Sequence, residues 1–187
     1  KLGCPVYVHT VLSLEMIVHI VCYAAFLLVE KNIPRPCIYT FCLFQRQNGM
    51  DIDWTTQLYN QATFIGSAVM LYKATGEKAY LDDAVLAADY VRNEMCDADG
   101  LLPFKNGVEQ GIYAAIFAQY IIRLIEDGNQ PQYMDWLRHN IDVAWNNRDV
   151  NRNVTFKDAA KPCPTGVMES YDASGCPALM QVISPFK

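Results

Sequence analysis

The sequence lacks the residue patterns that mark most metal sites and nucleophilic catalytic sites. It has no Cys-x-x-Cys pair, and its three histidines, His9, His19 and His139, show no ligand spacing. No Ser/His/Asp or Cys/His arrangement stands out either. Positive charge is also scarce, because Lys and Arg number 15 against 20 Asp and Glu, which gives a net charge of −5. We therefore expect no metal, no cofactor and no nucleic-acid partner.

The composition is that of one domain with a sizeable core. The chain has 187 residues, of which 52% are hydrophobic and eleven are tyrosines. The many aromatic residues fit either a helical core or a carbohydrate-binding surface. Among the seven cysteines, Cys163 and Cys176 lie in loop-like sequence. They would pair if the protein is exported, but we expect free thiols.

Residues 1–50 differ in character from residues 51–187. The stretch 6–30 is apolar and long enough to span a bilayer, but it contains His9, Glu15 and His19, which are costly in lipid. No cleavage site of small residues follows, so a signal peptide is not indicated. We expect a buried helix or a pair of strands in residues 6–30, not a membrane span, and a turn followed by a strand in residues 32–44.

The rest of the chain has helical periodicity. Apolar spacing predicts helices at residues 61–75, 80–95, 110–126, 131–145 and 178–183, with Gly76 ending the first. Phe64 aligns with Tyr113 and Tyr80 with Tyr133, so the helix pair recurs after about fifty residues. Such a repeat predicts an all-α fold of the α/α toroid type. We assign the first helix of each pair, which is rich in small residues, to the inner ring.

Polar residues precede both predicted inner helices. Tyr59, Asn60 and Gln61 come before the first, and Glu109 and Gln110 before the second. Asn60 alone would suffice as a helix cap. Since helix starts also leave backbone N–H groups unpaired, we expect these residues to line a cleft at one end of the ring, suited to a polar neutral ligand such as a sugar.

Several stretches resemble glycoside hydrolase family 76, the endo-α-1,6-mannanases. They are "YNQATFIGSAVMLYKATGEKAYLDDA", "IYAAIFAQYI", "NIDVAWNNRD" and "ESYDASGCPALMQVI". The resemblance covers about residues 54–185, the C-terminal half of such a domain. The chain departs from the family pattern at Ala62, where Gly is usual, and at Ala114 and Gln119, where Lys and Arg are common. The resemblance implies an (α/α)6 toroid, a mannan-type polysaccharide or oligosaccharide as partner, and an exported protein.

The resemblance also implies roles for particular residues. The expected substrate-binding residues are Tyr59, Asn60, Gln61, Trp54 and Glu109, with Trp54 or Phe64 stacking on a sugar. The family's catalytic pair of adjacent aspartates has no match. Asp82-Asp83 is the sole Asp-Asp in the sequence, and it falls on the solvated face of a predicted outer helix. Other carboxylates expected near the cleft are Asp51, Asp53, Glu169 and Asp172.

These observations predict a glycoside hydrolase-like protein acting on α-mannan, of the endo-α-1,6-mannosidase type. We expect it to be an incomplete domain that is inactive by itself. The alternative is a non-catalytic helical-repeat protein that binds carbohydrate or serves as a scaffold. A third interpretation, based on residues 6–29, is a membrane-anchored helical protein.

Overall fold

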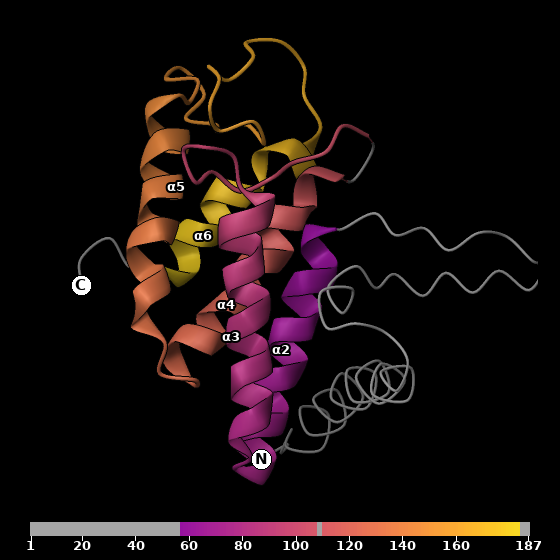
Figure 1. Cartoon of the computed structure of the whole chain (residues 1–187). Helices are drawn as coiled ribbons and strands as arrows, with labels where there is room; N and C mark the ends of the chain where they lie inside the picture. Colours follow the sequence, from indigo (N-terminus) through magenta and orange to yellow (C-terminus); the bar gives the residue numbers. More distant parts are fainter. Residues whose placement is uncertain (1–56, 108–109, 184–187) are drawn as a thin grey trace, which may run out of the picture.

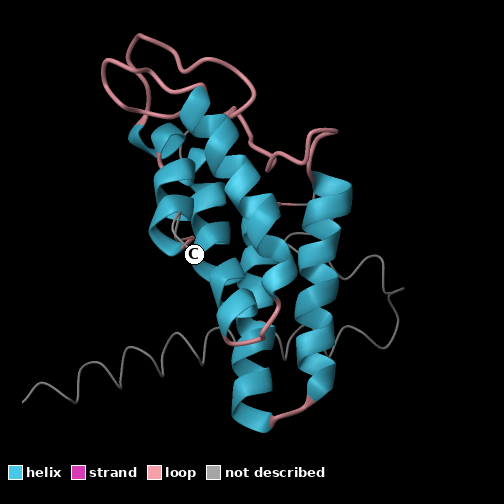
Figure 2. Cartoon of the chain, turned by 90° about the vertical axis from the view of Figure 1, so that its left-hand side faces the viewer, coloured by secondary structure: helices cyan, strands magenta, loops and turns pink. Residues whose placement is uncertain are grey.

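The computed structural model describes residues 57–107 and 110–183 (Figure 1). Their α-helices are α2 (Leu58–Thr75), α3 (Lys78–Tyr90), α4 (Tyr113–Glu126), α5 (Met134–Asn146) and α6 (Gly175–Val182). No strand occurs within these two ranges, where one isolated bridge joins Asp149 to Val154 (Figure 2). The all-α prediction is therefore confirmed for the described residues.

Short helical turns extend or precede these helices. They are the π-helix η3 (Val91–Met95) and the 3-10 helices η4 (Gln110–Ile112), η5 (Pro131–Tyr133) and η6 (Ser170–Ala173). With η3 added to α3, η4 to α4 and η5 to α5, the predicted helices 80–95, 110–126 and 131–145 are confirmed. Pro131 opens η5, where its missing N–H would have had no helical partner.

The helices form two antiparallel hairpins. Gly76 closes the first with a left-handed φ of 74°, and its N–H donates to the carbonyl of Tyr72 at 2.8 Å. Glycine adopts this conformation without strain, which is why it ends α2 as predicted. The second turn, between α4 and α5, uses Asn129 with a φ of 52°. Lys73 and Asp127 join the two hairpins at this end through an ion pair of 2.7 Å.

The five helices lie in two layers. Helix α4 packs between α2 and α6, while α3 packs on α2, and α5 contacts α6 (Figure 1). Helices α2, α4 and α6 therefore make one layer, with α3 and α5 outside it. The buried residues of α2 lie on most of its sides: Leu58, Gln61, Ala62, Ile65, Gly66, Ser67, Ala68 and Val69. This burial confirms the assignment of the helix rich in small residues to the inner layer.

Gly66 shows why small residues are needed in the inner layer. A Cβ atom at this position would lie 2.1 Å from Cδ1 of Tyr120 on α4. A larger residue at position 66 would therefore push α2 and α4 apart. Phe117, Ile121 and Leu124 of α4 are fully buried in the core, and the Phe117 ring packs against Trp136 of α5 at 5.8 Å between centroids.

Several predictions fall outside the described residues. They are the apolar segment of residues 1–50 and the turn and strand expected in residues 32–44. Within the described part of the chain, no helix is both long and apolar enough to cross a membrane. Cys163 and Cys176 are buried and carry free thiols, which confirms the expectation that they are unpaired. Cys96 is also a free thiol and is half-buried.

Candidate site at the amino-terminal ends of the inner helices

The three inner helices begin at the same end of the molecule. The rings of Tyr59 on α2 and Tyr113 on α4 have centroids 4.8 Å apart. At the start of α6, a Cβ atom on Gly175 would lie 2.9 Å from that of Ala114 on α4. Gln61 in the first turns of α2 and Gln110 just before α4 therefore lie at one end, as predicted. We call this end the rim; the long connections 96–107 and 147–169 also lie there (Figure 1).

Tyr59, Asn60 and Gln61 lie inside α2, and the prediction that they precede it is wrong. The helix begins at Leu58, and its N-cap is Gln57, which makes no side-chain capping bond. The capping role considered for Asn60 is therefore also wrong. An amide or a tyrosine fits the first helical turn as well as the residues before it, so the polar cluster did not mark the boundary.

The three side chains differ in exposure. Tyr59 and Asn60 are partly exposed, whereas Gln61 is 1% exposed and lies within the helix layer. The carbonyl of Asn60 accepts a hydrogen bond from Oγ1 of Thr63 at 3.1 Å. Their contact with a sugar stays a prediction, and Gln61 would need its surroundings to open before it could touch a ligand.

Other expected site residues cannot be placed. Trp54, Asp51, Asp53 and Glu109 lie outside the described residues. Phe64, the alternative stacking residue, is partly buried on α2 and packs against the core. Roles for all five in binding or catalysis stay predictions.

Asp172 lies beside the start of α4 and is paired with a cation. Its Oδ1 is 3.0 Å from Nζ of Lys157, and the two side chains are 13% and 8% exposed, respectively. Lys157 also lies over the ring of Phe156, at 5.8 Å from the centroid. Gly111, in η4, abuts Asp172 so closely that a Cβ atom would lie 2.6 Å from Oδ1. The ion pair therefore ties η6 to the connection 147–169, and the close approach of Gly111 places η6 against η4. Glu169, just before η6, is exposed.

The first long rim connection is pinned to the outer helix α5 by Asn140. The Leu102 N–H donates to Oδ1 of Asn140 at 2.8 Å. Nδ2 of Asn140 donates to the carbonyls of Gly100 and Trp136, both at 3.0 Å. Nε1 of Trp136 donates to the same Gly100 carbonyl at 2.7 Å. Because Asn140 is buried and its amide is bonded at both ends, the loop is held in one conformation.

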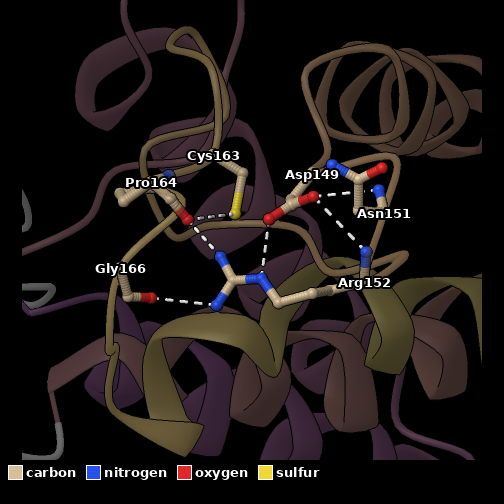
Figure 3. Close-up of polar contacts among 6 residues, drawn as sticks. All are labelled: Asp149, Asn151, Arg152, Cys163, Pro164 and Gly166. Atoms are coloured by element: carbon tan, nitrogen blue, oxygen red, sulfur yellow. Dashed lines mark hydrogen bonds and ion pairs between the residues drawn. The ribbon is translucent and has the colours of Figure 1, made fainter.

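The second long connection is held by Arg152 (Figure 3). Its Nε donates to Oδ2 of Asp149 at 2.6 Å, and its Nη1 donates to the carbonyl of Gly166 at 2.9 Å. Nη2 donates to the carbonyl of Pro164. Oδ1 of Asp149 accepts from the Asn151 N–H at 2.9 Å, closing a tight turn. The hydrogen bond from Arg152 holds the pKa of Asp149 below its usual value.

A small pocket lies under these loops, between the inner and outer layers. It is lined by α4 and α6 near their starts, by α5 and by both rim connections, and its volume is about 40 Å³. Since a cavity of roughly 10–15 Å³ by this measure already holds one water, the pocket has room for water molecules.

Two groups noted in the sequence lie on the outer helices. Asp82 is exposed on the outer helix α3 and pairs with Lys78 one turn before it, which agrees with the solvated face predicted for Asp82-Asp83. His139 is exposed on α5, with Nε2 3.1 Å from the carbonyl of Asp99. Within the described ranges, no three His, Cys, Asp or Glu residues are grouped as a metal site would require.

Sequence reasoning missed Asn140, Arg152 and Lys157. Each side chain forms hydrogen bonds or an ion pair with residues 12 to 40 positions away in the chain. Apolar periodicity carries no information about such contacts. The sequence offered one indication: a long connection rich in Asn and Pro needs side chains to form hydrogen bonds with its backbone N–H and C=O groups.

Comparison with known proteins places the chain in a family. The profile of glycosyl hydrolase family 76 matches residues 41–181, beginning earlier than the expected residue 54. None of the curated protein sequences matches significantly. Among solved structures, the α-1,6-mannanase from Salegentibacter sp. HEL1_6 is similar with a TM-score of 0.64 and 23% identity, over 73% of this chain and 43% of that chain.

Two further structures give the same fold. An inactive variant of the Salegentibacter enzyme, with two aspartates changed to alanine and α-1,6-mannotetrose bound, has a TM-score of 0.64, 24% identity and coverage of 73% and 42%. A structural-genomics target from Listeria innocua has a TM-score of 0.63, 26% identity and coverage of 73% and 39%. This chain thus spans about two fifths of the length of these structures. Its two helix layers are part of an (α/α)6 toroid, and the chain belongs to glycosyl hydrolase family 76.

Proposed function

We propose that the chain is part of a glycoside hydrolase domain that acts on α-mannan, of the endo-α-1,6-mannosidase type. Membership of family 76 supports this assignment most directly. The rim supplies a surface on which a glycan can lie, because three inner helices start there and two anchored connections border them. In this proposal Tyr59 and Asn60 contact the sugar, and Trp54, Gln61 and Glu109 contribute from the same end.

The catalytic groups of such an enzyme are two carboxylates that flank the glycosidic bond. The sole Asp-Asp of this sequence is Asp82-Asp83, and Asp82 is exposed on the outer helix α3. Asp172 is held in an ion pair with Lys157. We therefore expect the chain by itself to bind α-1,6-mannooligosaccharides without hydrolysing them.

Calorimetric titration of the purified chain with α-1,6-mannotetraose tests binding, and a reducing-sugar assay on α-1,6-mannan tests hydrolysis. Cellotetraose, a β-1,4-linked tetrasaccharide of glucose, is the control ligand. We expect heat from mannotetraose alone and no sugar release. Sugar release that is abolished by Glu169→Gln or Asp172→Asn would show that the chain does contain catalytic groups. Absence of binding to mannotetraose would overturn the proposed function.

A non-catalytic carbohydrate-binding or scaffold protein is the second candidate. The observation that favours it is the outer-face position of Asp82 in the sole Asp-Asp of the sequence. It predicts that no flanking or added segment restores hydrolysis. Activity gained by joining the chain to the amino-terminal half of a family 76 mannanase would exclude it.

A further inference from the structure

A tyrosine lies at the rim end of two inner helices and in the turn before the third. Tyr59 lies in the first turn of α2 and Tyr113 is the first residue of α4. Tyr171 lies in η6, the short turn that leads into α6. The three tyrosines thus come from three consecutive members of the inner layer, although they are far apart in the sequence.

The first two tyrosines form a continuous aromatic surface. Their ring centroids are 4.8 Å apart with the planes inclined by 54°, and both side chains are partly exposed. A tyrosine ring combines an apolar face with a polar hydroxyl, so it is suited to a ligand that also has apolar and polar sides. Sugar rings are ligands of this kind, with C–H faces and hydroxyl edges.

Tyr171 is the most exposed of the three and is rigidly mounted. Tyr171 is 37% exposed, whereas Tyr59 and Tyr113 are only partly exposed. Its carbonyl accepts from Oγ of Ser174 at 2.7 Å and from the Ser174 N–H at 3.1 Å. The next residue, Asp172, is tied to Lys157 and packs against Gly111. The exposed ring therefore sits on a backbone that is fixed against the start of α4.

The spacing of the helices sets the kind of ligand. Neighbouring packed helices are ~8–10 Å apart, so the path from α2 across α4 to α6 covers roughly 16–20 Å. That distance exceeds one sugar ring. We propose that Tyr59, Tyr113 and Tyr171 form an aromatic track along the rim that binds a glycan chain of several sugars, with Tyr171 at the α6 end. This inference rests on the proposed function for the identity of the sugar.

The test measures affinity against ligand length for the full chain. The ligands are mannose, α-1,6-mannotetraose and cellotetraose, and the variants are Tyr171→Ala, Tyr171→Phe and Leu86→Ala. Leu86 is the control because it is 44% exposed on the outer helix α3. Circular dichroism and melting temperature establish that each variant is folded. We expect Tyr171→Ala to weaken mannotetraose binding about three- to tenfold, Tyr171→Phe to weaken it less because the ring is kept, and Leu86→Ala to leave it unchanged.

The outcomes separate this inference from the proposed function. If mannotetraose binds equally to the parent chain and to Tyr171→Ala, the aromatic track is wrong and the proposed function stands. If only cellotetraose binds, with the same dependence on Tyr171, the track stands and the mannan assignment fails. If mannose binds as tightly as mannotetraose, or neither tetrasaccharide binds, the track is wrong.

Discussion

Lys157 and Asp172 form an ion pair of 3.0 Å that joins the second rim connection to the turn before α6. Both side chains are nearly buried, so each charge depends on the other. Removing one member of a buried pair leaves the other charge without a partner. Loss of the pair should therefore destabilise the rim and displace η6 together with Tyr171 and Glu169.

We predict that Lys157→Met lowers the free energy of unfolding by about 3 kcal/mol. The matched control is Lys78→Met, which breaks an exposed i,i+4 pair with Asp82 and should cost about 0.5 kcal/mol. Urea titration followed by circular dichroism measures both values. Equal effects of the two substitutions would contradict the structural role of the buried pair.

Gly111→Ala should destabilise the rim through steric overlap. The added Cβ would lie 2.7 Å from the backbone N and Cα of Asp172, which cannot rotate away. Overpacking of this kind costs about 1–3 kcal/mol. Gly166→Ala is the control, since a Cβ there meets nothing within 4 Å. The prediction fails if both variants melt at the temperature of the parent chain.

The clamp made by Asp149 and Arg152 should weaken in acid. The pKa of Asp149 in the folded chain is lowered from 3.8, chiefly by its hydrogen bond from Arg152. Its stabilising contribution is therefore fully present above pH 3.8 and is lost as the pH falls through the lower, folded pKa. Melting temperatures from pH 7 to pH 2.5 should fall less steeply for Asp149→Asn than for the parent. Parallel curves would mean that Asp149 does not contribute to acid sensitivity.

Cys96 and Cys176 should react slowly with iodoacetamide at pH 8 in the folded chain. Burial raises the pKa of the Cys96 thiol to about 12, assisted by the charge of Asp97, and burial raises the pKa of the Cys176 thiol to about 11. Since the thiolate is the reactive form, alkylation of Cys176 should be about a hundredfold slower than in urea. Peptide mass spectrometry resolves each site. A disulfide between Cys163 and Cys176 in a non-reducing digest would contradict the free thiols of this structure.

The helical framework could be predicted because its determinants are local. The first helix was expected at residues 61–75 and is Leu58–Thr75; the last was expected at residues 178–183 and is Gly175–Val182. Gly76 ended its helix as expected because a left-handed residue is needed there. The fifty-residue repeat also predicted correctly that Gln61 and Gln110 share one end. These features depend on residues close together in the sequence or on their repetition.

The candidate site was less predictable because its determinants are distant contacts. Gln61 was expected at the surface, but it is buried, since α2 packs on both α3 and α4 and has little free face. Tyr171 was not singled out, because its exposure depends on how η6 lies against η4. No pattern in the sequence indicated that Lys157 would meet Asp172.

Short turns and long connections lie at opposite ends of the helices, and the two ends differ in how well they can accept inserted residues. The hairpin turns at 76–77 and 127–130 are short, so a residue inserted there would displace packed helices. The connections 96–107 and 147–169 are long, and doubling the length of a loop adds only about 0.6 kcal/mol of closure entropy. Insertions are therefore tolerated almost entirely at the rim. Chain length can vary where a ligand would be contacted, while the helices beneath keep their register.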